Sequence, residues 1–282
     1  MILEKVIKCA AQTLKDHNIP SYELDAQIIL SDIMKINKEY LIINHQEIIS
    51  EKVIEKYDDA IKRRIKREPV AYIVGKKEFW SEDFVVNSKT LVPRPETELL
   101  IYKLVSFFKY KRINILDIGT GSGCILLSLL KELKLARGIG IDVSSKAIQV
   151  ANKNSRNLNL VNRSKFKIFD LNKYSLGKYD LIVSNPPYIR SSDIRNLSKD
   201  ITKYEPLNAL DGGVDGLDLI KKVIYKSTYL LKTKGLFALE IGHNQYRRVS
   251  NIMKSFGYRE VNKEYDYGSN VRCIISTRSS FF

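Results

Sequence analysis

The chain contains 282 residues, with 47 lysines and arginines against 32 aspartates and glutamates, which gives a net charge of +15. Hydrophobic residues make up 44% of it, which is ordinary for a globular core and excludes a disordered chain. No stretch approaches about 20 consecutive apolar residues and the N-terminus lacks a signal-peptide hydrophobic segment, so neither a membrane span nor secretion is expected.

The first 67 or so residues are predicted to form helices. Ser21 and Ser50 are expected to cap two of them. The apolar residues at helical spacing are Leu24, Ile28, Ile29 and Ile33 in the first helix, and Val53, Ile54, Tyr57, Ile61 and Ile65 in the second. The short apolar stretches 70–73 and 84–86, separated by Gly75-Lys76-Lys77, are typical of a hairpin or a linker.

From residue 113 onward, predicted strands alternate with predicted helices. The strands are 113–118, 138–142, 166–169, 179–184, 235–241 and 272–276, and residues 124–133 form the first helix between them. This alternation indicates an α/β fold with a mostly parallel sheet that is covered on both faces. The sequence therefore predicts a small helical domain followed by a nucleotide-binding α/β domain.

The positive charge is confined to the second part of the chain. Residues 1–90 carry 15 basic and 15 acidic side chains, whereas residues 91–282 carry 32 and 17. The stretch 143–169 contains six basic residues and no acidic one. Such a surface can attract nucleic acid or an acidic partner, but a lysine-rich solvated surface is the favoured interpretation.

A glycine-rich segment, Gly119-Thr120-Gly121-Ser122-Gly123, lies between the first strand and its helix. Glycines at such a turn let the backbone approach a ligand closely, and the helix N-terminus favours negative charge. The segment is neither a P-loop nor a complete dinucleotide fingerprint, since Cys124 replaces the third glycine. Asp142 ends the next strand, where a carboxylate can accept hydrogen bonds from both hydroxyls of a ribose. Together these features predict an adenosine-type cofactor, although Asp142 could also cap a helix.

The strand 179–184 ends in Asn185-Pro186-Pro187-Tyr188. The prolines fix the backbone angles of this loop and remove two N–H donors, so acceptor atoms dominate it. The side-chain oxygen of Asn185 and the carbonyl of Pro186 are expected to accept both protons of a planar NH2 group, which stacks on Tyr188. Because this stabilises the positive charge that develops as the nitrogen attacks, the motif predicts electrostatic and positional catalysis without a dedicated general base.

With these motifs the chain resembles S-adenosylmethionine-dependent methyltransferases, and in particular the HemK/PrmC family of release-factor-specific protein-(glutamine-N5) methyltransferases. Further matching segments are Leu91-Val92-Pro93-Arg94-Pro95-Glu96-Thr97-Glu98, Tyr204-Glu205-Pro206, Ala209-Leu210 and Gly213-Val214-Asp215-Gly216-Leu217. The resemblance covers most of the chain. It implies a Rossmann-like class I methyltransferase sheet, mostly parallel with an antiparallel strand near the C-terminus, preceded by a small helical domain.

The resemblance also implies domain roles. Residues 1–85 would be a helical substrate-recognition domain with a hairpin linker, and residues 86–282 the S-adenosylmethionine-dependent methyltransferase domain. The implied substrate is the glutamine in the Gly-Gly-Gln loop of peptide chain release factors. We therefore expect a cytoplasmic enzyme that needs neither a metal nor a membrane, and for which nucleic acid contact is possible but not required.

The family's site residues carry over to matching positions of this sequence. Gly119, Thr120, Gly121, Ser122 and Gly123 would line the methionine part of the cofactor, Asp142 would hold its ribose, and Asp170 and Leu171 would flank its adenine. Asn185, Pro186, Pro187 and Tyr188 would bind the substrate glutamine; Asn185, Pro186 and Tyr188 would act in catalysis, and Asn185 would also border the cofactor. One departure is Asn270-Val271-Arg272, where the family often has Asn-Asp-Arg.

Two other functions are compatible with parts of the sequence. The Asn-Pro-Pro-Tyr motif also suits adenine-N6 methyltransferases of DNA or RNA, which act on a flipped or unpaired base. No separate target-recognition domain is evident, however, and the first 90 residues carry no net charge. A non-catalytic module that binds a nucleotide or a translation partner is disfavoured by the intact motif. The three cysteines and three histidines lie far apart, so no zinc site or disulfide framework is predicted and a reducing compartment is expected.

Overall fold

In a computed structural model of the chain, which describes residues 1–278, the backbone divides into two compact units. The first unit consists of Met1–Lys76 together with Ser198–Tyr204, and the second consists of Lys77–Leu197 and the chain from Glu205 onward. Each unit has a hydrophobic core of its own. No helix among the described residues is both long and apolar enough to cross a membrane.

The first unit is helical, as predicted. Its helices are α1 (Leu3–Asp16), α2 (Tyr22–Met34), α3 (Lys38–Ile43), α4 (Glu51–Ile65), α5 (Val70–Val74) and α9 (Lys199–Tyr204). α2 and α4 begin directly after Ser21 and Ser50, but neither serine side chain makes a capping hydrogen bond. The expected stripe on α2 is partly wrong: Ile29 is buried as expected, but Leu24 is exposed and the helix also buries Ala26 and Leu30.

A buried ion cluster holds α9 in the first unit. Arg64 of α4 is only 4% exposed, and its guanidinium lies 2.7 Å from Asp25 of α2 and 2.8 Å from Asp200 of α9. The Tyr204 hydroxyl donates to the carbonyl of Lys66 at 2.9 Å. A segment from the middle of the sequence thus packs with the N-terminal helices.

The expected hairpin is present, but not where the apolar stretches suggested. Val70–Val74 forms the helix α5, which ends at Gly75 with a φ of 76°. The hairpin pairs β1 (Lys76–Phe79) with β2 (Glu82–Val85), and Trp80 and Ser81 form its turn at φ values of 52° and 58°. Phe79 and Phe84 are buried in the core of the second unit, so the hairpin packs there rather than with the helices that precede it.

The second unit contains a seven-stranded sheet in the order β5-β4-β3-β6-β7-β9-β8. Its strands are β3 (Asn114–Ile118), β4 (Arg137–Asp142), β5 (Ser164–Ile168), β6 (Tyr179–Ser184), β7 (Leu231–Glu240), β8 (Tyr258–Tyr265) and β9 (Val271–Arg278). The first five of these pair in parallel, and β9 runs antiparallel to both of its neighbours, β7 and β8. This confirms the predicted mostly parallel sheet with an antiparallel strand near the C-terminus.

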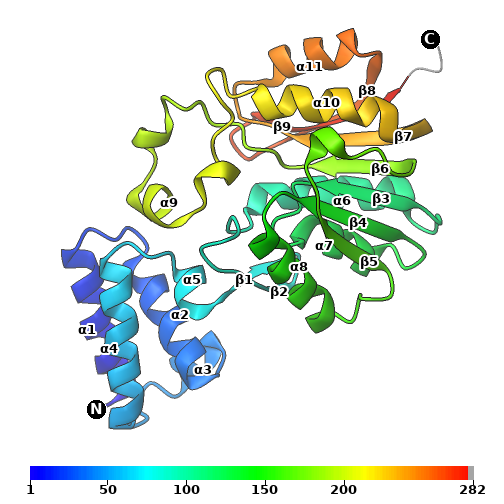
Figure 1. The fold of residues 1–282 in the computed structure, drawn as a ribbon. Coiled ribbons are helices and arrows are strands. Elements are labelled where there is room, and N and C mark those ends of the chain that lie inside the picture. The colour runs from blue at the N-terminus through cyan, green and yellow to red at the C-terminus, as the bar shows by residue number, and fades with distance from the viewer. Residues whose placement is uncertain (279–282) are drawn as a thin grey trace. The chain divides into compact units, whose positions relative to one another are not determined.

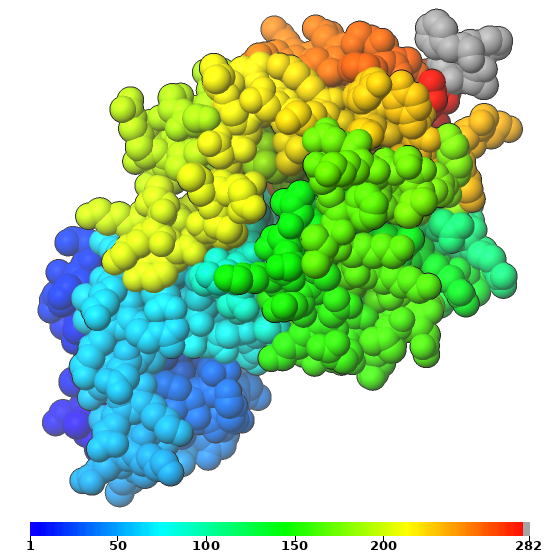
Figure 2. Space-filling model, in the orientation of Figure 1, coloured from blue at the N-terminus to red at the C-terminus, as the bar shows by residue number. Residues whose placement is uncertain are grey.

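Helices cover both faces of the sheet (Figure 1). They are α6 (Glu98–Phe108), α7 (Cys124–Glu132), α8 (Ser145–Asn157), α10 (Asp218–Leu230) and α11 (Tyr246–Ser255), with short turns η1 (Pro95–Thr97), η2 (Leu171–Lys173), η3 (Ile194–Asn196) and η4 (Leu207–Ala209). Because strand side chains alternate between faces, Ile115 packs with α6 and α7 whereas its neighbour Leu116 packs with α10 and α11. Figure 2 shows the surface of α10 beside that of the segment between β5 and β6, where Lys226 donates to the carbonyl of Asn172.

The topology places a ligand site at one edge of this sheet. The chain winds outward from β3 through β4 to β5 and then returns to the other side of β3 as β6. In a sheet of this kind a crevice opens at the carboxyl ends of the strands where the winding reverses. The glycine segment, Asp142 and the Asn-Pro-Pro-Tyr motif follow the carboxyl ends of β3, β4 and β6 respectively.

Candidate active site

The glycine segment forms an open cradle between β3 and α7. The N–H groups of Gly119 and Thr120 both donate to the carbonyl of Ile141, at 2.9 and 3.0 Å, which fixes the segment to the end of β4. Gly119 and Gly121 adopt φ values of +73° and +55°, and apart from the glycine and its two chain neighbours no atom lies within 4 Å of the position that a Cβ would occupy at either residue. The backbone therefore borders open space, as close approach to a ligand requires.

Asp142 faces this cradle from the end of β4. Its Oδ2 accepts the N–H of Gly121 at 3.0 Å, and its Oδ1 accepts the N–H of Ser144 at 2.9 Å. The cap of α8 is Ser144, whose Oγ accepts the N–H of Ala147 at 3.2 Å, so the helix does not use Asp142 as its cap. Each carboxylate oxygen has a further lone pair, and Asp142 thus retains acceptors for the two hydroxyls of a ribose.

Asp117 lies beneath the cradle in β3 and is fully buried. Thr120 Oγ1 donates to its Oδ2 at 2.6 Å, whereas Oδ1 has no hydrogen-bond partner among residues 1–278. Burial raises the pKa of Asp117 to about 7, and the hydrogen bond from Thr120 opposes this shift. The carboxyl group holds Thr120, and with it the shape of the glycine segment.

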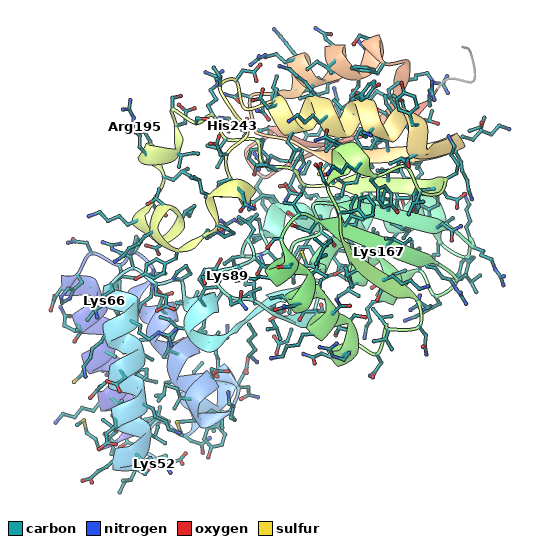
Figure 3. The ribbon with its side chains drawn as sticks, in the orientation of Figure 1. Lys52, Lys66, Lys89, Lys167, Arg195 and His243 are labelled. Atoms are coloured by element: carbon teal, nitrogen blue, oxygen red, sulfur yellow. The ribbon has the colours of Figure 1, made fainter. Side chains whose placement is uncertain are left out.

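The glycine segment, Asp142 and the Asn-Pro-Pro-Tyr motif border one cavity of about 170 Å³. Most of the predicted site residues line it: Gly119, Thr120, Gly121, Ser122, Asp142, Leu171, Asn185, Pro186 and Pro187. Lys89, Val143 and Phe169 line it as well, and Lys89 is labelled in Figure 3. The exposed Val143 and the half-buried Phe169 supply apolar surface beside Asp142 that the sequence analysis missed.

Three predicted residues do not line the cavity. Gly123 packs internally, since a Cβ there would lie 3.0 Å from the ring of Phe166. Asp170 is exposed and accepts the N–H of Asn172 at the start of η2. Tyr188 is half-buried, and its ring lies against the guanidinium of Arg272.

A buried hydrogen-bond chain supports Asn185 from below. Asn185 Nδ2 donates to Thr97 Oγ1 at 3.3 Å, and Thr97 Oγ1 donates to Glu240 Oε2 at 2.6 Å. Glu240 ends β7 and is fully buried, and burial raises its pKa to about 7, against the hydrogen bond from Thr97 and the positive charge of Arg272. Sequence analysis gave neither Thr97 nor Glu240 a role, although a carboxylate at the end of the apolar run 236–239 was a usable signal.

Two further segments of the family resemblance border the same cavity, through Arg94 and Pro206. Arg94 Nη2 lies 2.7 and 2.8 Å from the two carboxylate oxygens of Glu205, which joins the Pro-Arg-Pro segment to Tyr-Glu-Pro. Arg272 contacts Tyr188 as described, whereas Val271 is buried among apolar residues. The valine at position 271, where the family often has aspartate, thus packs in the hydrophobic core, and Arg272 beside it still contacts Tyr188.

Several other residues with reactive or charged side chains have no part in the arrangement around Asn185. His243 is exposed in the loop after β7 (Figure 3). Burial raises the pKa of Cys124 to about 12, so its thiol remains protonated at neutral pH. No group of three metal-binding side chains occurs within residues 1–278. In the basic stretch, Arg163 binds the carbonyls of Leu130, Leu133 and Ala136, while Lys167 is exposed on β5 (Figure 3).

The sheet order, with a cavity at the carboxyl ends of β3, β4 and β6, defines a Rossmann-like α/β fold of the kind that methyltransferases have. A methyltransferase from Pyrococcus furiosus shares this fold with a TM-score of 0.54, at 18% identity over 79% of this chain and 99% of its own. The ribosomal protein L11 methylase of Lactobacillus delbrueckii subsp. bulgaricus gives a TM-score of 0.50, at 18% identity over 66% of this chain and 81% of its own. The predicted fold class is confirmed.

Sequence comparison then gives the family. Residues 5–75 match the PrmC N-terminal domain, and residues 109–264 match a methyltransferase domain. A release factor glutamine methyltransferase from Clostridium acetobutylicum is 38% identical over 98% of both chains. One from Buchnera aphidicola subsp. Schizaphis graminum is 40% identical over 94% of this chain and 95% of its own. The chain belongs to the release factor glutamine methyltransferase family, which confirms the resemblance found in the sequence.

Proposed function

We propose that this protein transfers a methyl group from S-adenosylmethionine to the side-chain amide nitrogen of the glutamine in the Gly-Gly-Gln loop of peptide chain release factors. The observation that supports this most directly is that Asn185 and Pro186 line the same cavity as the glycine cradle and Asp142. A site for an NH2 group therefore adjoins a site for an adenosine-type cofactor. The family's named activity is the same.

The residues at the cradle fit S-adenosylmethionine. Asp142 offers two carboxylate oxygens to the ribose hydroxyls, and Val143, Phe169 and Leu171 offer apolar surface to the adenine. The backbone of the glycine segment borders the open space that the methionine part needs, and Asp170 is placed near the adenine by the family resemblance alone. When bound, this cofactor supplies an electrophilic methyl group on a positively charged sulfur.

The chain's contribution to the reaction is made at the substrate nitrogen. The lone pair of an amide nitrogen is delocalised into its carbonyl group, so an amide is a poor nucleophile. Asn185 Oδ1 and the Pro186 carbonyl accept its two N–H protons, orient the nitrogen and stabilise the positive charge that develops on it. Pro187 keeps the loop rigid and Tyr188 borders it.

We assign the helical first unit to recognition of the release factor. The cofactor and amide motifs all lie in the second unit, and the residues that match the PrmC N-terminal domain lie in the first. A glutamine side chain offers too little surface for selectivity, so part of the recognition has to come from elsewhere on the partner protein. Because release factors act in translation, we place the enzyme in the cytoplasm.

The test is methylation of purified release factor with labelled S-adenosylmethionine, followed by mass spectrometry. One methyl group is expected on the glutamine of the Gly-Gly-Gln loop, and none on a release factor in which that glutamine is replaced by alanine. Single-stranded DNA and RNA serve as competing acceptors in the same assay. Methylated adenine without methylated release factor would instead establish the adenine-N6 activity.

A further inference from the structure

Thr97 lies between the catalytic loop and a buried carboxyl group. Its Oγ1 is 3.3 Å from Asn185 Nδ2 and 2.6 Å from Glu240 Oε2. Thr97 is only 2% exposed and Glu240 is not exposed at all, so water cannot replace either contact. The three groups come from η1, the end of β6 and the end of β7.

The number of protons in this chain of contacts determines its direction. An ionised carboxylate accepts hydrogen bonds but cannot donate, and a hydroxyl group has a single proton. When Glu240 is ionised, above its raised pKa of about 7, Thr97 Oγ1 donates the 2.6 Å hydrogen bond to its carboxylate, so the proton of Thr97 is committed to Glu240. Thr97 Oγ1 can then only accept a hydrogen bond from Asn185, so the NH2 group of Asn185 has to be the donor.

This direction controls what Asn185 presents to the cavity. The nitrogen and oxygen of a side-chain amide lie on opposite sides of its terminal carbon, so an NH2 group held by Thr97 leaves Oδ1 turned away from Thr97. With the amide rotated by half a turn, Asn185 would present N–H donors to the N–H donors of the substrate.

We infer that Thr97 and Glu240 are positioning residues that fix the Asn185 amide with its oxygen available to the NH2 group of the substrate. The inference rests on the proposed function, because only an NH2 substrate requires an acceptor at that position. Glu240 does not line the cavity, and Thr97 borders it with only 2% of its surface exposed; in this inference both act through Asn185. Thr97→Val keeps the shape of the side chain and removes the hydroxyl, whereas Thr97→Ser keeps the hydroxyl.

The first measurement is the single-turnover rate of release factor methylation. Thr97→Val should lower this rate by about 10- to 100-fold, as expected when a reacting group loses its alignment. Its affinity for S-adenosylmethionine should stay within about twofold of the parent protein, and Thr97→Ser should recover most of the rate. The matched control is Thr228→Val, which removes another buried threonine hydroxyl, on α10 and outside the cavity, and should leave the rate unchanged.

The second measurement shows whether Thr97 acts through Asn185. The Asn185→Ala variant has no side-chain amide for Thr97 to position. Adding Thr97→Val to it should therefore lower the methylation rate by less than about threefold further, although each substitution alone makes the enzyme slow. The side-chain amide of Glu240→Gln can either accept a hydrogen bond from Thr97 or donate one to it. This variant should therefore lose less of the methylation rate than Thr97→Val.

The outcomes separate the two ideas. An unaltered protein that does not methylate release factor contradicts the proposed function itself. If the unaltered protein is active, wild-type rates for folded Thr97→Val overturn the inference, and so does a full additional loss in the Asn185→Ala background. A wild-type rate for Glu240→Gln removes Glu240 from the chain of positioning residues.

Discussion

Arg272 of β9 holds Tyr188, the last residue of the Asn-Pro-Pro-Tyr motif, in two ways. Its Nη2 donates to the Tyr188 hydroxyl at 3.0 Å, and its guanidinium carbon lies 5.5 Å from the centre of the ring. The Tyr188 carbonyl in turn accepts the side-chain amide of Gln245 at 2.9 Å. The hydroxyl of Tyr188 is thus fixed to β9 and its carbonyl to Gln245, at the start of α11, so this residue anchors the loop that carries Asn185.

Arg272→Lys should therefore slow catalysis while cofactor binding persists. A lysine cannot both donate to the hydroxyl and lie flat against the ring, as a guanidinium does. We expect turnover to fall by about tenfold with an unchanged dissociation constant for S-adenosylmethionine. Steady-state methylation of release factor and calorimetry measure the two quantities. Arg278→Lys, near the other end of β9, is the matched control; equal turnover in both variants would contradict the anchoring role of Arg272.

Asp142→Ala should weaken the binding of S-adenosylmethionine. Hydrogen bonds to a charged group contribute about 1.5–3 kcal/mol, so the dissociation constant should rise by about tenfold or more. Part of this loss comes from the glycine segment, since Asp142 also accepts the N–H of Gly121. Isothermal titration calorimetry gives the affinity, with the exposed Asp193→Ala as the control. Unchanged affinity in a folded Asp142→Ala variant would remove Asp142 from the ribose site.

Much of the second unit could be predicted because its strands are short apolar runs followed by functional motifs. The expected strand 179–184 coincides with β6, and 138–142 differs from β4 by one residue. The carboxyl ends of parallel strands share one edge of the sheet, so motifs far apart in sequence could be brought together by topology alone. In the structure the glycine segment, Asp142 and Asn185 border one cavity at this edge.

The features that were missed depend on packing rather than on local pattern. β8 was not predicted, because Tyr258–Tyr265 contains four charged residues and is partly exposed at the edge of the sheet. Val70–Val74 consists of residues that suit a strand, yet tertiary packing makes it a helix. The contact of Thr97 with Glu240 joins residues 143 positions apart, and no periodicity indicates such a pair.

The buried carboxyl of Asp117 should make stability depend on pH. Its pKa is raised from an ordinary 3.8 to about 7 in the folded protein, chiefly by burial. Below pH 4 the group is neutral in both states; above pH 7 it is charged in both, and the folded state bears the cost of a buried charge. Stability is therefore lost as pH rises from about 4 to about 7.

Asp117→Asn removes this titration while keeping an acceptor for Thr120. As the pH rises from about 4 to about 7, the free energy of unfolding of the unaltered protein should decrease by up to a few kcal/mol more than that of the variant. Urea denaturation of both proteins between pH 4.5 and 8 measures the difference, and the other titrating groups are common to both. A difference that does not change with pH would show that Asp117 titrates at its ordinary pKa.

Arg64→Met should destabilise the first unit more than the second. The substitution keeps much of the side-chain volume but leaves Asp25 buried without its partner and releases Asp200 of α9. Removing one member of a buried ion pair costs about 3–5 kcal/mol. Lys62→Ala, which breaks an exposed pair with Asp59 on the same helix, is the control and should produce no measurable change.

Two optical signals separate the units in this experiment. Trp80 is the only tryptophan and lies in the second unit, whereas helical circular dichroism comes from both units. In urea, the circular dichroism of Arg64→Met should begin to fall at a lower concentration than the Trp80 fluorescence changes. If both signals shift together by the same amount, the two units unfold as one cooperative structure. If neither signal shifts, leaving Asp25 without its partner has no measurable cost, which contradicts the prediction.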